Sequence, residues 1–165
     1  MTVETLPNIG PVNLRPMRPD DGRALVRFFE RSTPEDVRLR FLGPLRALST
    51  RQVERFTHID PEREVAYVVE EPATREFMSI GRLAIAPDSH RAVFAIAVRS
   101  DLKGRGIGRF VMAHLLDEAR ERGVEEIFGD ILDENTTMLA FARQLGFTLT
   151  NVPESAAIVR ATYRL

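Results

Sequence analysis

Hydrophobic residues in the first third of the chain recur at the spacing of an amphipathic helix. Leu25 and Phe28 fall on one helical face. Pro34 suits the first position of a second helix, and Ser49 with Gln52 three residues later matches a capping box at the start of a third. These signals predict three helices, over residues 20–31, 34–42 and 49–56.

From residue 65 onward, short runs of β-branched and small apolar residues replace this pattern, which is typical of strands. The run Ala92–Val98 is apolar at every position, so we expect a central strand covered on both faces. Met112, Leu115 and Ala119 form a helical stripe. The pattern predicts strands over 12–17, 65–69, 79–86, 92–98 and 126–132, helices over 108–122 and 135–145, and a closing hairpin of 147–151 and 157–163.

This order of elements predicts one mixed sheet with helices on both of its faces, in the α/β (α+β) class. The 165 residues suit a single domain. We expect that domain to span residues 1–165, with residues 1–10 loosely ordered.

Composition narrows the function classes. The chain has no cysteine, which excludes disulfides, thiolate nucleophiles and cysteine-ligated metals. Its formal net charge of −1 gives no general attraction to nucleic acid or to an anionic membrane. The N-terminus lacks the pattern of a signal peptide and no apolar run is long enough to span a bilayer. We therefore expect a cytoplasmic protein, with neither nucleic acid nor membrane as partner and with its oligomeric state undetermined.

Three alternating glycines and several cations follow the run 92–98. Gly104, Gly106 and Gly108 allow backbone N–H groups to approach a ligand closely, and the start of the next helix favours an anion. A P-loop would place Lys and then Ser or Thr after its last glycine, where this chain has Arg109 and Phe110. The cations around the glycines are Arg99, Lys103, Arg105 and Arg109. The stretch predicts a pyrophosphate site.

The segment Lys103–Gly108 resembles the acyl-CoA loop of the GNAT superfamily of acetyltransferases, and Asn135–Phe147 resembles its N-x-x-A…L-G-F segment. Asp36–Phe41, Arg55–Asp60 and Phe94–Gly104 resemble the catalytic domain of bacterial Pat-type protein lysine acetyltransferases. The resemblance covers nearly the whole chain. It implies the GNAT fold, with a central mixed, mostly antiparallel sheet and helices on both faces.

The resemblance also implies acetyl-CoA as cosubstrate and no metal. The pantetheine arm is expected to pair with the strand that ends at Val98, and the pyrophosphate to bind to the glycine loop. The residues implied to bind the cosubstrate are Ile96, Val98, Lys103, Gly104, Arg105, Gly106, Ile107, Gly108, Arg109 and Asn135.

The resemblance fails at the expected general base. The Pat-type subgroup carries a glutamate on the strand before the loop, where this chain has Val93. Many GNAT enzymes also carry a tyrosine as the acid for the thiolate, where this chain has Ala142. Glu64, in an Arg-Glu pair that the subgroup shares, is the best remaining candidate for the base.

Other titratable residues are expected to be structural or solvated. They are Asp88 and His90 in a turn, His58 at a helix end and His114 within a helix. A metal cluster of His58, Asp60 and Glu64 is an alternative that spacing alone leaves open. Either Arg38 or Arg40 is expected to face the acceptor.

Two functions fit this sequence. In the first, the protein is an N-acetyltransferase that acts on a primary amine, either a protein lysine or a small molecule. In the second, it is an acyl-CoA-binding regulatory module with weak or no catalysis, because Val93 cannot accept a proton.

Overall fold

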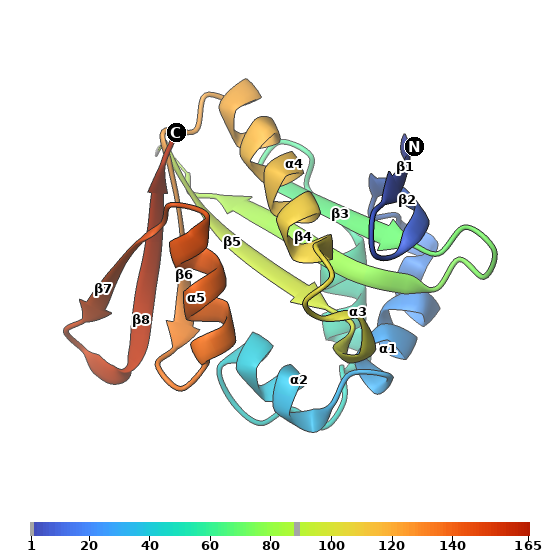
Figure 1. Cartoon of the computed structure of the whole chain (residues 1–165), viewed down its shortest axis with the longest axis horizontal. Helices are drawn as coiled ribbons and strands as arrows, with labels where there is room; N and C mark the ends of the chain where they lie inside the picture. The colour runs from blue at the N-terminus through green and yellow to red at the C-terminus, as the bar shows by residue number, and fades with distance from the viewer. Residues whose placement is uncertain (1, 88–89) are drawn as a thin grey trace.

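The computed structural model describes residues 2–87 and 90–165, and within them the chain forms an eight-stranded sheet in the order β1-β2-β3-β4-β5-β6-β8-β7 (Figure 1). The strands are β1 (Thr2–Leu6), β2 (Gly10–Pro16), β3 (Glu64–Glu70), β4 (Phe77–Ile85), β5 (Arg91–Val98), β6 (Glu126–Leu132), β7 (Thr148–Val152) and β8 (Ser155–Arg164). The α-helices are α1 (Gly22–Glu30), α2 (Pro34–Phe41), α3 (Thr50–Thr57), α4 (Ile107–Glu121) and α5 (Thr136–Gln144), and η1 (Pro19–Asp21) and η2 (Ser100–Leu102) are single 3₁₀ turns.

Both faces of the sheet carry helices. Helices α4 and α5 pack on one face, and α1 and α3 pack on the other (Figure 1). Neighbouring strands are antiparallel except for the parallel pair β5 and β6. The predicted mixed, mostly antiparallel sheet with helices on both faces is therefore confirmed.

Strands β5 and β6 separate soon after they meet. They pair over only three residues, Arg91–Val93 with Glu126–Phe128, and then diverge toward α2 (Figure 1). The ring of Phe94 lies close to β6 at Gly129, where a Cβ would come within 2.7 Å of it. The divergence leaves a cleft in the middle of the sheet.

This cleft corrects the prediction that residues 92–98 are covered on both faces. Strand β5 is central, but Val93 is 41% exposed, and residues 95–97 are only half-buried. An apolar residue can face either a protein core or a ligand site, and the two are indistinguishable in the hydrophobic pattern.

The N-terminal residues also differ from the prediction of loose order. Residues 2–6 form β1, which pairs antiparallel with β2 from Thr2 opposite Leu14 to Leu6 opposite Gly10. Most of β1 is exposed, so main-chain pairing holds this edge strand and its sequence carries little hydrophobic signal. Residue 1 lies outside the described residues.

Buried ion pairs join β2 to its neighbours. The Arg15 guanidinium lies 2.8 Å from Asp21 Oδ1 and 3.1 Å from Glu70 Oε2, and all three side chains are buried. The hydrogen bond to Asp21 is the main cause that raises the pKa of Arg15. The chain thus supplies carboxylates to a guanidinium that it removes from water.

Gly81 brings α4 against β4. A Cβ on Gly81 would lie 2.3 Å from Val111 Cγ1 and 3.1 Å from Leu115 Cδ1. We expect Gly81→Ala to lower the free energy of unfolding by about 1–3 kcal/mol, because an overpacked core must shift. Urea denaturation measures this loss. Gly43→Ala is the control, since its Cβ would meet nothing within 4 Å; equal losses in the two variants would contradict the prediction.

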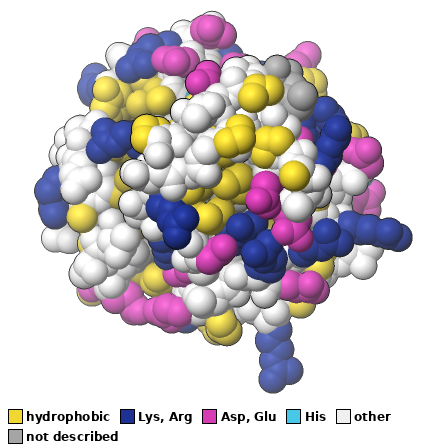
Figure 2. All heavy atoms as spheres, turned by 45° about the vertical axis from the view of Figure 1, so that its right-hand side comes forward, with side chains coloured by type: hydrophobic (Ala, Val, Ile, Leu, Met, Phe, Trp, Pro, Cys, Tyr) yellow, Lys and Arg dark blue, Asp and Glu magenta, His cyan; other side chains and the backbone are white. Residues whose placement is uncertain are grey.

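Basic and acidic side chains intermingle on the face that Figure 2 shows, with smaller hydrophobic groups between them. In the part of the chain that the structure describes, no helix is both long and apolar enough to cross a membrane.

Candidate functional site

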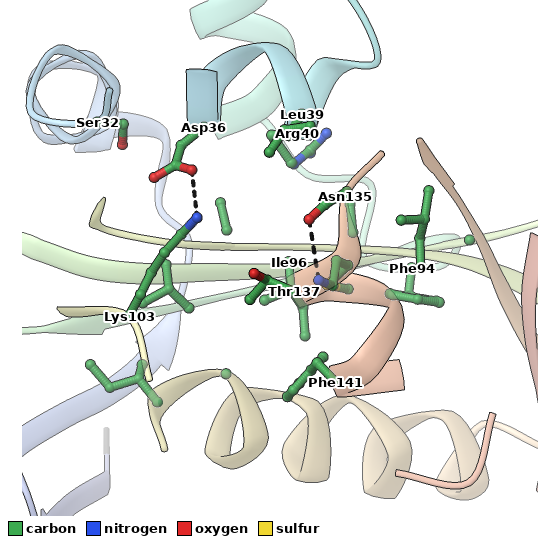
Figure 3. Close-up of a pocket in the computed structure, with 18 of the residues that line it drawn as sticks. Ser32, Asp36, Leu39, Arg40, Phe94, Ile96, Lys103, Asn135, Thr137 and Phe141 are labelled. Carbon is green, nitrogen blue, oxygen red and sulfur yellow. Dashed lines mark hydrogen bonds and ion pairs between the residues drawn. The ribbon is translucent and has the colours of Figure 1, made fainter. Parts of the chain in front are cut away.

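A cleft of about 760 Å³ lies between β5, β6, α2 and the first turn of α4 (Figure 3). Phe94 and Ile96 of β5 form its floor, and Phe141 of α5 closes one side. Leu39 and Arg40 face it from α2. Its lining is mostly apolar with a few polar groups, which is typical of small-molecule sites.

The glycine loop forms one end of this cleft. Gly104 and Gly106 have φ angles of +76° and +94°, which a residue with a Cβ rarely adopts. Gly106 is the N-cap of α4 and no side chain caps the helix. Among the described residues, the first N–H groups of α4 thus lack a side-chain acceptor, and together with the helix dipole they favour an anion.

Nine of the ten residues implied to bind the cosubstrate line the cleft: Ile96, Val98, Lys103, Gly104, Gly106, Ile107, Gly108, Arg109 and Asn135. The tenth, Arg105, is exposed and does not line it.

Asn135 has a structural role as well as a place in the cleft. Its Oδ1 accepts a hydrogen bond from the Met138 N–H at 3.2 Å and so caps α5. Asparagine is a favoured N-cap residue. The side-chain amide N–H groups remain available as donors.

Helix α2 is tied to both sides of the cleft. Asp36 accepts hydrogen bonds from Lys103 Nζ and Ser100 Oγ, each at 2.5 Å, and Arg38 pairs with Glu134 before α5. Burial alone would raise the pKa of Asp36. The hydrogen bonds from Lys103 and Ser100 outweigh this effect, so the pKa of Asp36 lies below its ordinary value. Sequence analysis missed Asp36 and Glu134, because their partners lie far away in the chain.

We expect Asp36→Asn to tighten acetyl-CoA binding by about threefold to tenfold, since a unit charge a few ångströms from an anion is worth about 1 kcal/mol in water. The substitution releases Lys103 from its ion pair. Titration calorimetry measures the affinity. Glu35→Gln removes one negative charge from the same helix without touching Lys103, and is the control. Weaker binding by Asp36→Asn would show that the tie between α2 and the loop outweighs the charge.

Glu64 does not reach the cleft. Its carboxylate is 2.9 Å from Arg55 Nη1, and it does not line the cavity. Glu64 pairs with Ala84, which pairs with Val93, so about 10 Å separates the backbones of Glu64 and Val93. The placement does not support the candidate base that sequence analysis selected.

The other titratable candidates also lie elsewhere. Nδ1 of His58 is 2.9 Å from the Glu54 carbonyl at the end of α3, His114 packs edge-on against Phe110, and His90 is exposed. Asp88 lies outside the described residues. Residues 2–87 and 90–165 contain no group of three or more His, Asp or Glu side chains that could hold a metal ion.

The expected catalytic positions hold no proton donor or acceptor. Val93 lines the cleft, and Ala142 is 1% exposed within the core. Two carboxylates in the described part of the chain do line the cleft, Asp36 and Asp130. Both are engaged in ion pairs, Asp130 with Arg160 at 2.8 Å.

Arg40 is the arginine of α2 that faces the cleft, whereas Arg38 pairs with Glu35 and Glu134 at the rim. Of the two arginines that sequence analysis offered, Arg40 is therefore the one placed to face an acceptor in the cleft.

Known proteins resemble this chain along most of its length. Residues 25–147 match the sequence model of the acetyltransferase (GNAT) family. The crystal structure of the GNAT domain of S. lividans PAT is 28% identical and covers 99% of this chain and 96% of that domain, with a TM-score of 0.91. Acetyltransferase PA5475 of Pseudomonas aeruginosa is 27% identical over 159 residues, which is 95% of this chain and 86% of that protein. A cAMP-binding acyltransferase from Mycobacterium smegmatis, at 21% identity and a TM-score of 0.68, shares the fold over 46% of its own chain.

Proposed function

Since the chain belongs to the acetyltransferase (GNAT) family, we propose that it transfers an acetyl group from acetyl-CoA to a primary amine, either a protein lysine or a small molecule. The observation that carries this proposal is the cleft between β5 and β6, which ends in the glycine loop and the uncapped start of α4. The amine nitrogen attacks the thioester carbonyl carbon, the carbon–sulfur bond breaks and CoA leaves as its thiolate.

The residues fit the two polar parts of acetyl-CoA. A Cβ at Gly104 or Gly106 would meet nothing within 4 Å, so the space in front of the loop is open to a pyrophosphate. In the described structure, β5 beyond Val93 has no paired strand on the side of β6, so its main-chain groups there can pair with the amides of a pantetheine arm.

The acceptor must lose a proton, and the cleft offers no free carboxylate among the described residues. A lysine amine with a pKa near 10.4 is neutral in roughly one molecule in 2,500 at pH 7. A positioned base contributes about 10²–10⁴ in rate. We propose that the proton passes to water at the exposed side of Val93, and that the cleft accelerates transfer mainly by holding the two reactants together.

Val93 favours a second candidate, an acyl-CoA-binding regulatory module that turns over little or no acetyl-CoA. The two candidates differ in turnover alone. We further propose that residues 1–165 form one domain, since both hydrophobic clusters pack on the same sheet, and that it acts in the cytoplasm.

The test is CoA release from acetyl-CoA with a panel of primary amines. Because the chain has no cysteine, a thiol reagent reports only the CoA that is formed. Release that depends on both amine and protein supports the acetyltransferase. Acetyl-CoA binding without release for any amine supports the regulatory module.

We expect Glu64→Gln to leave kcat/KM for the best amine within about threefold of wild type, because its carboxylate is bound to Arg55 and lies outside the cleft. Steady-state CoA release over a range of pH measures the effect. A loss of about 100-fold or more, together with loss of the pH dependence of kcat/KM, would restore Glu64 as the general base.

A further inference from the structure

Arg40 is a guanidinium that no described carboxylate balances. The two arginines with buried side chains in the described part of the chain hold carboxylates: Arg15 pairs with Asp21, and Arg99 Nε lies 2.7 Å from Asp101 Oδ1. Arg40 is half-buried. No hydrogen bond or ion pair joins Arg40 to any residue that the structure describes, and its side chain projects into the cleft (Figure 3). An anionic group of a ligand could therefore form the ion pair that Arg40 lacks within the described residues.

The charge of a second guanidinium, that of Arg82, acts on Arg40. Arg40 lies over the ring of Phe41 at 4.8 Å, Arg82 lies over the ring of Phe56 at 4.9 Å, and the two rings are 6.1 Å apart. One nitrogen of Arg82 also donates to the Phe56 carbonyl at 2.9 Å. A guanidinium that lies over an aromatic ring makes a favourable cation–π contact, and its N–H groups can still donate to an anion. We call Arg40 and Arg82 the arginine pair.

The side chain of Arg82 projects from the same face of the sheet as that of Val93, the residue found where the Pat-type subgroup has a glutamate. Arg82 of β4 pairs with Ala95 of β5, and side chains at paired positions project from the same face of a sheet. Val93 is two residues from Ala95 and therefore projects from that face too. Ala95, Val93 and Arg40 line the cleft, whereas Arg82 does not. Arg40 is therefore the member of the pair that can contact a ligand, and Arg82 contributes its charge from behind.

The charge around the arginine pair is unbalanced. Burial lowers the pKa of Arg40 to about 10, and the charge of Arg82 adds to this effect. Burial also lowers the pKa of Arg82 to about 10; the charge of Glu64 raises this pKa in part, and the charge of Arg55 lowers it. Glu64 itself is held by Arg55. An ammonium group alone would be repelled here, whereas a carboxylate would be attracted.

We propose that Arg40, reinforced by the charge of Arg82, binds the carboxylate of the acceptor, and that the acceptor is therefore a free amino acid that is acetylated on its amine. This inference rests on the proposed function. It also offers a reason why the cleft works without a glutamate at residue 93. Positive charge near an ammonium group lowers the pKa of that group and so raises the neutral, reactive fraction of the amine.

The first experiment compares each of the common amino acids with its amide, at saturating acetyl-CoA, by release of CoA. The two members of a pair differ only in the carboxylate. The carboxylate raises the pKa of the neighbouring ammonium, so intrinsic reactivity favours the amide. We expect kcat/KM to favour the best amino acid over its amide by about tenfold or more, because a charged hydrogen bond is lost in the amide. Equal rates, or a preference for the amide or for a lysine within an acidic peptide, would overturn the proposal.

The second experiment removes the pair one member at a time. We expect Arg40→Gln to raise the KM for the amino acid by about tenfold, and Arg82→Gln, which lies outside the cleft lining, to raise it by less. Both variants should slow the amide less than the amino acid, so that the preference for the carboxylate falls, while the affinity for acetyl-CoA stays within about twofold of wild type. Arg40→Lys retains the charge but not the planar fork of donors, and should restore part of the preference. Arg51→Gln, which removes the same charge from the exposed side of α3, is the control. An equal loss of rate on amino acid and amide would show a structural role only.

A third measurement separates this inference from the proposed function. Calorimetry records the binding of the N-acetylated amino acid to the protein loaded with CoA, which needs no turnover. If no amine is acetylated but the N-acetylated amino acid binds about tenfold more weakly to Arg40→Gln than to wild type, the carboxylate site stands and the transferase function fails. If amines are acetylated and Arg40→Gln binds this ligand as wild type does, the function stands and the carboxylate site fails.

Discussion

Replacement of Gly106 by valine is expected to lower the affinity for acetyl-CoA by about 100-fold, the equivalent of two hydrogen bonds to a charged group. Gly106 has a φ angle of +94°, and it faces open space in the cleft. A branched side chain would both occupy that space and turn the first N–H groups of α4 away from the pyrophosphate. Titration calorimetry with acetyl-CoA measures the loss.

The matched control is Gly123→Val, just beyond the opposite end of α4. Gly123 has a φ angle of +75°, and a Cβ there would also meet nothing within 4 Å. Both variants should lose roughly 1–2 kcal/mol of stability from the left-handed backbone, but only Gly106→Val should lose affinity. Unchanged affinity in Gly106→Val would place the pyrophosphate elsewhere.

Replacement of Val93 by glutamate is expected to raise kcat about 100-fold for an amine without a carboxylate, because it supplies the base that the cleft lacks. Val93 lines the cleft and is 41% exposed, so the longer side chain has room and does not disturb the core. The affinity for acetyl-CoA should stay within twofold. Steady-state CoA release and calorimetry give the two quantities.

Val93→Gln is the control, because a glutamine side chain has nearly the same shape as glutamate but no basic oxygen. It should show no gain in kcat. An equal rate in wild type, Val93→Glu and Val93→Gln would refute the argument that the base has been lost. With a free amino acid as acceptor, the new carboxylate should also raise KM, since it would compete for Arg82 on the same face of the sheet.

The elements that sequence analysis predicted well have local causes. The capping box of Ser49 and Gln52 forms as expected, with both hydrogen bonds made. Pro34 begins α2, and the Thr33 hydroxyl before it accepts the Asp36 N–H at 3.1 Å. Gly123 follows α4 with a positive φ angle. Each of these signals lies within a few residues of the structure that it determines.

The cleft depends on contacts between distant parts of the chain, and sequence analysis predicted only part of it. The glycine loop is a local signal, and in the structure it lies at one end of the cleft. The partners of Lys103 and Arg38 lie 67 and 96 residues away, beyond any periodic pattern. Glu64 was selected as a base from its place in the sequence, but Arg55, nine residues earlier, holds its carboxylate.

Helix α2 is attached to the two sides of the cleft by ion pairs, and it buries little apolar surface there. Val37 is its one buried residue, and its ties to the two sides, Asp36 with Lys103 and Arg38 with Glu134, are partly exposed ion pairs. Such pairs contribute about 0–1 kcal/mol each and are screened as the Debye length falls from about 8 Å at physiological ionic strength to about 3 Å in 1 M salt. We therefore expect helix α2 to separate from the two sides of the cleft at little energetic cost, and more readily as the ionic strength rises.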